Sequence, residues 1–253
     1  MCRRQQLGSV LLAAALCGCG GSLRAAAPAA PKVSSFAPIG DVVQQIEYYV
    51  ERTVKASAEK SEFDDGAQAR LKKDANTIAV LGLALALHDE AAPLKAHAAA
   101  IVAAAQALAA HNEDFEQATK AVASLKQAVA AGGSTDSKLT WTSKVGALSP
   151  LMHQVPFINN GLKKGVAATN PKAAPNAATL AVIAQASMAD TSAVKNPADL
   201  AKWYEFCAAM REGAAKANAG LHAQDKAATA AGMKILSQSC EDCHAIFRKT
   251  ETK

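Results

Sequence analysis

The sequence predicts an all-helical protein built from two four-helix bundles in tandem. After Phe36, apolar residues recur every three or four positions, and strand-like alternation is absent. Gly, Pro and Asn fall where helices would begin or end. The chain also repeats itself, because NTIAVLGLALA from Asn76 resembles ATLAVIAQASM from Ala178. Alanine-rich helices can look alike by composition alone, but the helix ends repeat at matching spacing, so two related bundles are expected.

The first bundle is expected over residues 37–133. Its four helices are each bounded by a turn or a capping residue: 41–58; from the Asp64-Asp65-Gly66 turn to about His88; from Pro93 to about His111; and from Asn112, as N-cap, to Gly132-Gly133. No cysteine occurs in this range, and its histidines are not at ligand spacing. We therefore expect this bundle to bind neither metal nor cofactor, and its histidines to be solvated or to cap helix ends.

The second bundle is expected over residues 138–253. Its four helices follow the same scheme: 139–168, broken or bent at Ser149-Pro150 and Pro156; 174–189; from Asn196-Pro197 to Gly220; and from Asp225, as N-cap, onward. The two halves differ at their ends, since SLKQAVAAGG closes the first and LSQSCEDCHAIF closes the second. Only the second bundle therefore has cysteines for a site.

Residues 1–18 are typical of a signal peptide. Two arginines precede an apolar run at residues 7–16, which is too short to span a bilayer. The following LCGC approximates a lipoprotein cleavage site, which would place a lipid anchor on Cys19; ordinary cleavage among the neighbouring small residues is the alternative. Residues 19–36 are expected to form a flexible tether. No other segment is apolar for long enough to cross a membrane, so we predict an exported, periplasmic protein, attached to a membrane only through that anchor.

The composition excludes several classes of function. Lys and Arg number 27 against 22 Asp and Glu, a formal charge of +5, but the basic residues are scattered, so nucleic acid is not expected as a partner. No Ser/His/Asp or paired-carboxylate constellation stands out, and we predict no enzyme. Aromatic residues make up only 4% of the chain, which leaves few bulky groups to fill a core. An embedded planar cofactor would supply much of what is missing.

The motif that carries chemistry is SCEDCHAIFRK, close to the C-terminus. Cys240, Cys243 and His244 form C-x-x-C-H, the pattern of covalent c-type haem attachment. On a helix these three positions share one face, so two thiols can reach the two vinyl groups of one porphyrin while the histidine meets its iron. A zinc site would need more ligands, a redox dithiol would need a βαβ pattern, and a disulfide within a helix turn would be strained. We favour one covalent haem c.

With its predicted helices, this motif resembles the cytochrome c-prime family. The resemblance rests on a C-terminal C-x-x-C-H on the fourth helix of a bundle, followed by Phe247 and Arg248, and it covers residues 139–249. It implies haem between the helices, His244 as the proximal axial ligand, Arg248 beside the proximal face, and a residue of the bundle's first helix over the distal face. The chain departs from the family in the prolines of that helix, in lacking an Arg near the distal pocket, and in its extra haemless copy.

The sixth coordination position of the iron has three candidate occupants. Met152 belongs to the apolar stripe of the second bundle's first helix, which points it into the core, and a thioether is a good soft ligand. An iron left open behind Leu148 or Leu151 is the alternative. His153 is the third candidate, although it lies about 100° round the helix from Met152 and is expected to face solvent.

Two further residues are candidates for haem contact. Trp203 shares a helix face with Cys207 and Met210 and is a candidate for contact with the porphyrin edge, although core packing explains it equally well. Phe247 continues the stripe of the last helix beyond Cys243 and is a second candidate. Cys207 is expected to be an inert buried thiol.

One-electron transfer is the function that these features favour, with unidentified redox proteins as donor and acceptor. Covalent haem in a rigid, apolar bundle requires nothing further of the sequence. Binding or sensing of NO or CO at a five-coordinate iron is the second reading. A third is that the haemless bundle docks a redox enzyme and the haem acts as a relay. A homodimer also stays open.

Overall fold

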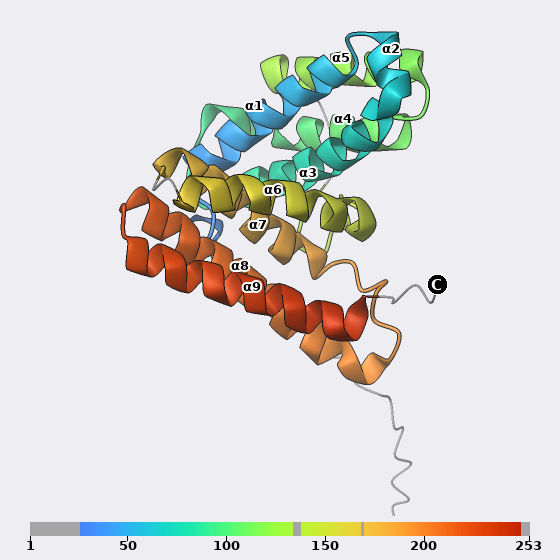
Figure 1. The fold of residues 1–253 in the computed structure, drawn as a ribbon. Coiled ribbons are helices and arrows are strands. Elements are labelled where there is room, and N and C mark those ends of the chain that lie inside the picture. The colour runs from blue at the N-terminus through green and yellow to red at the C-terminus, as the bar shows by residue number, and fades with distance from the viewer. Residues whose placement is uncertain (1–25, 134–137, 168–169, 249–253) are drawn as a thin grey trace, which may run out of the picture.

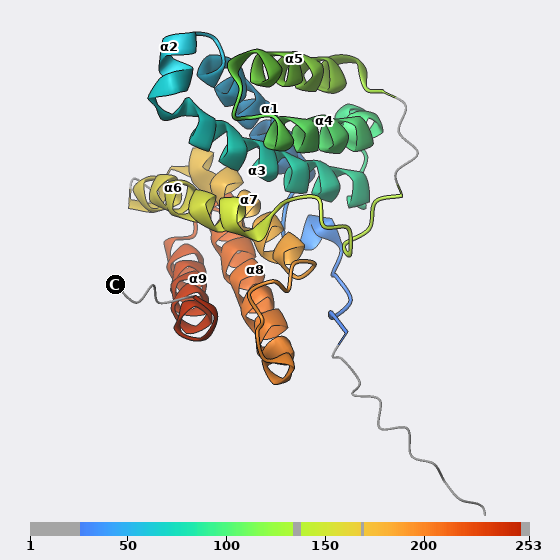
Figure 2. The same ribbon diagram turned by 90° about the vertical axis from the view of Figure 1, so that its right-hand side faces the viewer.

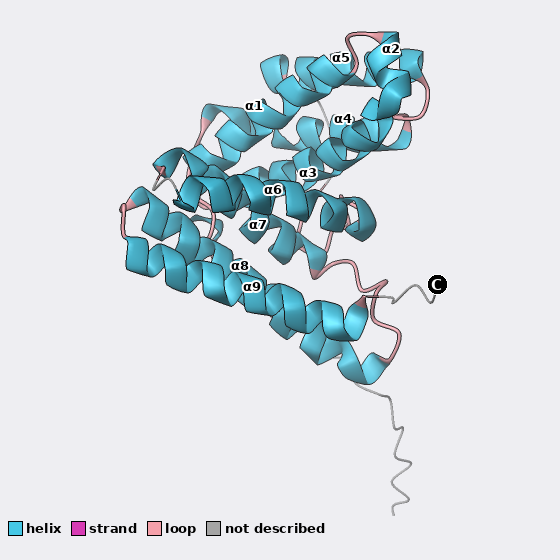
Figure 3. Ribbon diagram, in the orientation of Figure 1, coloured by secondary structure: helices cyan, strands magenta, loops and turns pink. Residues whose placement is uncertain are grey.

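The structure is a computed structural model that describes residues 26–133, 138–167 and 170–248. Every regular element in these ranges is helical, as the sequence predicts (Figures 1 and 3). The α-helices are α1 (Ile39–Ala56), α2 (Lys60–Glu62), α3 (Gln68–Leu87), α4 (Ala98–Ala110), α5 (Phe115–Ala131), α6 (Leu148–Ala167), α7 (Ala174–Ser187), α8 (Leu200–His222) and α9 (Lys226–Phe247). The signal-peptide and lipid-anchor predictions concern residues outside the described ranges.

The helices pack as two groups that share one core. In the N-terminal half α1 packs on α3, α3 on α4 and α4 on α5, while α6 to α9 pack each on the next in the C-terminal half (Figures 1 and 2). The halves meet where α6 and α7 contact α1 and α3. One apolar core runs from Ile46 and Leu81 in the first half to Leu162 and Ile183 in the second. Because α7 packs on helices of both halves, almost all of its residues are buried.

Most helix ends lie where local chemistry predicts them. The side chain of Asp225 accepts a hydrogen bond from the Ala228 amide and begins α9, as expected. The turn before α3 is also confirmed, with Gly66 at a positive φ of 97° that only glycine adopts freely. The prediction for Asn112 is wrong, because Asp114 caps α5 by accepting from the Gln117 amide. Asn112 instead donates its side-chain amide to the carbonyl of Gln68.

Residues 138–147 are irregular, although the sequence analysis placed most of them in a helix. Val145 is buried, and the Ala147 amide donates to Oδ1 of Asn76 on α3 at 2.7 Å. These contacts hold the segment against the first half in a non-helical conformation, and α6 therefore begins only at Leu148. The break predicted at Ser149-Pro150 thus falls at the start of α6, which then continues through Pro156 without a break.

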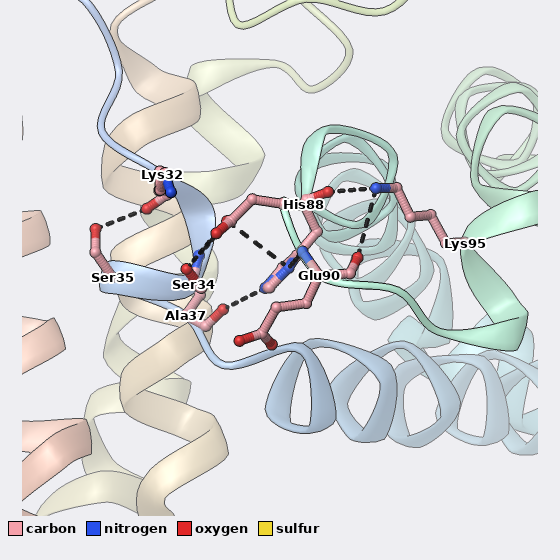
Figure 4. Close-up of polar contacts among 8 residues, drawn as sticks. Lys32, Ser34, Ser35, Ala37, His88, Glu90 and Lys95 are labelled. Atoms are coloured by element: carbon pink, nitrogen blue, oxygen red, sulfur yellow. Dashed lines mark hydrogen bonds and ion pairs between the residues drawn. The ribbon is translucent and has the colours of Figure 1, made fainter.

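The end of the predicted tether is part of the folded core. Val33 and Phe36 are 2% and 3% exposed, so the tether ends before Val33 rather than at residue 36. Figure 4 shows how this segment is held: Ser34 bonds to Asp89, and the ring of His88 bonds to the carbonyl of Ala37 at 2.9 Å. His88 does lie at the C-terminal end of α3, but it is buried rather than solvated.

Within the described parts of the chain, one stretch is apolar enough to cross a membrane by length and composition, contrary to expectation. It is Pro93–Ala110, which contains α4. Alanines supply most of its apolar character, and its larger apolar residues, Ile101, Val102 and Leu108, are buried against the rest of the first half. In this structure α4 therefore packs on α3 and α5 in the N-terminal half.

Helices α8 and α9 lie unusually close together. A Cβ added at Gly232 would come within 2.4 Å of the Ala217 backbone nitrogen, and one at Gly213 within 2.5 Å of the Leu236 nitrogen. Gly220 is similarly close to Thr229. Glycine lets the two backbones approach where any side chain would separate them. The three residues define the α8–α9 seam, which fixes α9 against α8.

Candidate functional site

A cavity of about 320 Å³ lies among the four helices of the C-terminal half. Helix α9 contributes Cys240, Cys243 and His244 to its lining, and α6 contributes Met152. The structure thus brings together the three residues of the C-x-x-C-H motif and the predicted distal candidate from a helix about 90 residues earlier in the chain. The size falls at the lower end of the range of about 300–1,000 Å³ that ligand pockets occupy.

The cavity exists because α6 and α9 lie apart. Helix α9 is fixed to α8 by the glycine seam, whereas α6 packs on α7 and α3 and has at most marginal contact with α9 (Figures 1 and 2). Trp203, Phe206, Cys207 and Met210 of α8 also line the cavity, at the spacing of one helical face. The site is therefore a mostly apolar hollow, with α6 facing α9 across it.

Helix α6 runs antiparallel to α9. Near the start of α6, Leu148 belongs to the same small apolar cluster as Cys243 and Phe247. Burial raises the pKa of the Cys240 thiol. Lys163, near the end of α6, lies close enough for its charge to oppose this rise in part. Met152 lies one turn after Leu148, and His244 lies one turn before Phe247. Met152 and His244 both line the cavity, from facing helices.

The other distal candidates lie elsewhere. His153 is exposed, as predicted from its position on the helix, and it does not line the cavity. Leu151 is 1% exposed and packs in the shared core, and Leu148 packs beside Trp203. Of the four residues considered, Met152 is the one that lines the cavity.

The two thiols and the imidazole of the C-x-x-C-H motif are largely uncharged near neutral pH. Burial raises the pKa of the Cys243 thiol to about 11, and the neighbouring Cys240 adds to the rise. His244 is exposed in this structure, but partial desolvation by its neighbours and the adjacent charge of Arg248 lower its pKa. Neutral imidazole is the form that binds a metal, so His244 is in the protonation state that a ligand needs. Cys207 is also buried, which raises its pKa and fits an inert thiol.

The predicted haem contacts divide into two groups. Trp203 lines the cavity, is 3% exposed, and donates its indole N–H to the carbonyl of Ser187 at 3.3 Å. Phe247 does not line it but packs edge-on behind Trp203, with ring centroids 5.3 Å apart. Arg248 is exposed at the C-terminal end of α9, next to His244. Phe206 lines the cavity and was not predicted, although its spacing from Trp203 and Met210 marks the same face.

The lining fits a bulky apolar group with a metal centre better than a bare metal ion. Among the described residues, no three His, Cys, Asp or Glu side chains converge as ligands, whereas a structural zinc site needs four. A haem needs one or two axial ligands, because its ring supplies the rest. Asn159 supports an occupant as well, since its Oδ1 atom is buried at the cavity and has no hydrogen-bond partner within the described parts of the chain.

The chain was compared with known proteins at three levels. No protein-family model matches it, and no match was found among curated proteins or among solved structures.

Proposed function

We propose that this protein is an exported c-type cytochrome that carries one covalent haem c and transfers single electrons. The observation that carries the proposal is one cavity lined by both thiols of C-x-x-C-H, by its histidine and by a methionine from the facing helix. We also propose that the two groups of helices are related four-helix bundles, of which only the second carries haem.

The chain's residues would have distinct roles in this function. Cys240 and Cys243 would each add a thiol S–H across a vinyl group, which turns the C=C bond into a thioether and leaves no by-product. His244 would donate its ring nitrogen as the proximal ligand, and Met152 its sulfur on the opposite face. When bound, haem supplies an iron that cycles between two oxidation states, and soft Met ligation favours the reduced one. The apolar walls from α8 would keep water from the iron.

Covalent attachment is tested by producing the chain in a host that has cytochrome c maturation and staining denatured protein for haem. The unaltered protein should retain haem after denaturation, and Cys240→Ala with Cys243→Ala should not. Cys207→Ala is the matched control, because Cys207 lines the same cavity without belonging to the motif. Retention of haem in the double variant would refute the proposal, as would an unaltered protein without covalent haem.

Binding of NO or CO is a second candidate function, favoured by the loose approach of α6 to α9. Because these helices have at most marginal contact, nothing clamps Met152 against His244. A five-coordinate iron would then accept a diatomic ligand. Rapid and complete formation of a CO complex by the ferrous protein would favour this function over a closed electron carrier.

A third candidate function is a redox relay, in which the first half docks a redox enzyme and the haem passes on its electrons. The shared core would hold the docked half and the haem-bearing half together.

A further inference from the structure

A second cavity, of about 380 Å³, lies where α1, α3 and α6 meet. Gln154 and Phe157 are its lining residues on α6, whereas Met152 and Asn159 of the same helix line the candidate haem site. At about 100° per residue, these two pairs lie on different faces of α6. The second cavity is therefore separate from the first, and the proposed function leaves it without a role.

Basic side chains predominate around this cavity. Arg52, Lys55, Arg70 and Lys73 line it, against two acidic residues, Asp74 and Glu62. Lys55 pairs with Glu51 outside the lining, at 2.6 Å. No carboxylate pairs with Arg70 or Lys73 among the residues that the structure describes. Four cations around one hollow repel one another, and a multivalent anion would relieve that repulsion.

Asp74 does not pair with Arg70 or Lys73, because its carboxylate oxygens already accept hydrogen bonds from Arg52 and Gln154. It is 1% exposed, and it accepts from Nε of Arg52 at 2.9 Å and from the side-chain amide of Gln154 at 2.7 Å. These bonds hold Asp74 at the floor of the cavity and leave Arg70 and Lys73 unneutralised. The bonds to Asp74 also fix the position of the Arg52 guanidinium.

Neighbouring side chains fix the Arg52 guanidinium but leave some of its N–H donors without an acceptor. Its guanidinium lies 4.3 Å from the centre of the Phe157 ring, and Asp74 engages Nε and, at 3.4 Å, Nη2. A guanidinium has five N–H donors, so at least two remain for a further acceptor. An arginine already fixed by a buried carboxylate and an aromatic ring loses little freedom when it binds an anion.

We propose that this cavity binds a phosphate-bearing anion such as a diphosphate group, which would meet Arg70 and Lys73, the two lining cations without a carboxylate partner among the described residues, and the free donors of Arg52. Arg52, positioned by Asp74 and Phe157, would donate from below, while Arg70 and Lys73 would close on the phosphate oxygens through charge-assisted hydrogen bonds. The phosphate could come from a soluble molecule or from a lipid headgroup, because the recognition chemistry is the same for both.

The test is calorimetric titration of the full chain with inorganic pyrophosphate at low ionic strength. Arg70→Gln with Lys73→Gln should weaken binding at least about tenfold, because two charge-assisted bonds are lost. Lys72→Gln is the matched control: Lys72 lies on the same helix, is exposed, pairs loosely with Glu113 at 3.9 Å and does not line the cavity. Its affinity should stay within about twofold, in keeping with the small effect of surface ion pairs.

A second arm distinguishes the source of the phosphate. Vesicles containing phosphatidic acid are offered to the same three proteins in a sedimentation assay. Binding of vesicles but not pyrophosphate, lost in the double variant, would identify a lipid headgroup as the source. The proposal is overturned if the unaltered protein binds neither probe, or if the double variant binds as tightly as Lys72→Gln. Neither experiment requires haem, so failure of this proposal can be distinguished from failure of the proposed function.

Discussion

At the scale of single residues, Met152 is the most informative position. It lines the same cavity as His244, from the facing helix, while its neighbour His153 is exposed. We expect Met152→Ala in the haem-loaded protein to remove the weak red charge-transfer band of His–Met haem and to lower the midpoint potential, because a soft ligand that favours ferrous iron is lost. Absorption spectroscopy and redox titration measure the two effects.

His153→Ala is the control for this prediction, since it changes the adjacent residue without altering the cavity lining. It should leave both the band and the potential as they were. A high-spin ferric spectrum in the unaltered protein would refute Met152 ligation and favour the gas-binding function.

The thiols give a second residue-scale prediction, for the haem-free protein. With its pKa raised to about 11, Cys243 holds far less thiolate at pH 8 than an ordinary thiol with a pKa of 9.0. Because the thiolate is the nucleophile, alkylation by iodoacetamide should be about 100-fold slower in the folded protein than in denaturant. Mass spectrometry of the peptide containing Cys243 follows the rate. Equal rates in both states would show that the thiol is not shielded.

At the scale of helices, the glycine seam makes a prediction about stability. In Gly232→Ala the new Cβ would meet the Ala217 nitrogen at 2.4 Å and the Gly213 carbonyl oxygen at 2.8 Å. Backbone atoms cannot move aside as a flexible side chain would, so the helices must separate. We expect a loss of about 1–3 kcal/mol in the free energy of unfolding, measured by urea denaturation.

Gly40→Ala provides the comparison, because a Cβ at Gly40, in the first turn of α1, meets nothing within 4 Å. It should be neutral or slightly stabilising, since alanine favours the helix over glycine. If Gly232→Ala were as stable as Gly40→Ala, the close approach of α8 and α9 would not require glycine at this position.

The sequence predicts most of these helices but not how closely they pack. Asp225 and the turn at Gly66 could be located because capping and positive φ are local properties. Asp114 competes with Asn112 for the same role, and a choice between two good caps two residues apart depends on tertiary contacts. The irregular segment before α6 could not be foreseen, because its anchor at Asn76 lies about 70 residues earlier in the chain.

The candidate site could be predicted in its chemistry but not in its full lining. The spacing within one helix was enough to predict Cys240, Cys243 and His244. Phe206 could have been found from its spacing to Trp203 and Met210, whereas Lys163 reaches the cavity only through the packing of α6, which no local pattern encodes. The missing partner of Asn159 is likewise visible only once the helices are assembled.

At the scale of the whole molecule, the halves are joined by buried polar contacts as well as by the shared core. Asp74 of the first half, which is paired with Arg52, accepts a hydrogen bond from Gln154 of the second, and Asp41 on α1 bonds with His222 and Asn218 on α8. These contacts fix the relative placement of the halves, because each requires a defined geometry. A buried charge left without its partner is costly.

Arg52→Leu is therefore expected to destabilise the protein by about 3 kcal/mol near neutral pH. Burial already raises the pKa of Asp74 against the opposing effect of Arg52, and removal of Arg52 raises it further. A carboxyl whose folded pKa is raised favours folding in its protonated form, and this contribution is lost as pH rises. The difference in stability between variant and unaltered protein should accordingly shrink as the pH falls from 7 toward 4.5, in urea denaturation at each pH. A difference independent of pH would show that Asp74 is not the group responsible.

The α8–α9 seam also bears on how the cavity can admit a bulky group. Helix α9 holds its two thiols on a hairpin whose backbones are already in contact, while α6 stands free of it across the cavity. Entry of a bulky group would therefore leave the α8–α9 hairpin intact. Any widening of the cavity would have to come on the side of α6, another face of which is fixed in the shared core by Leu151, Ile158 and Leu162.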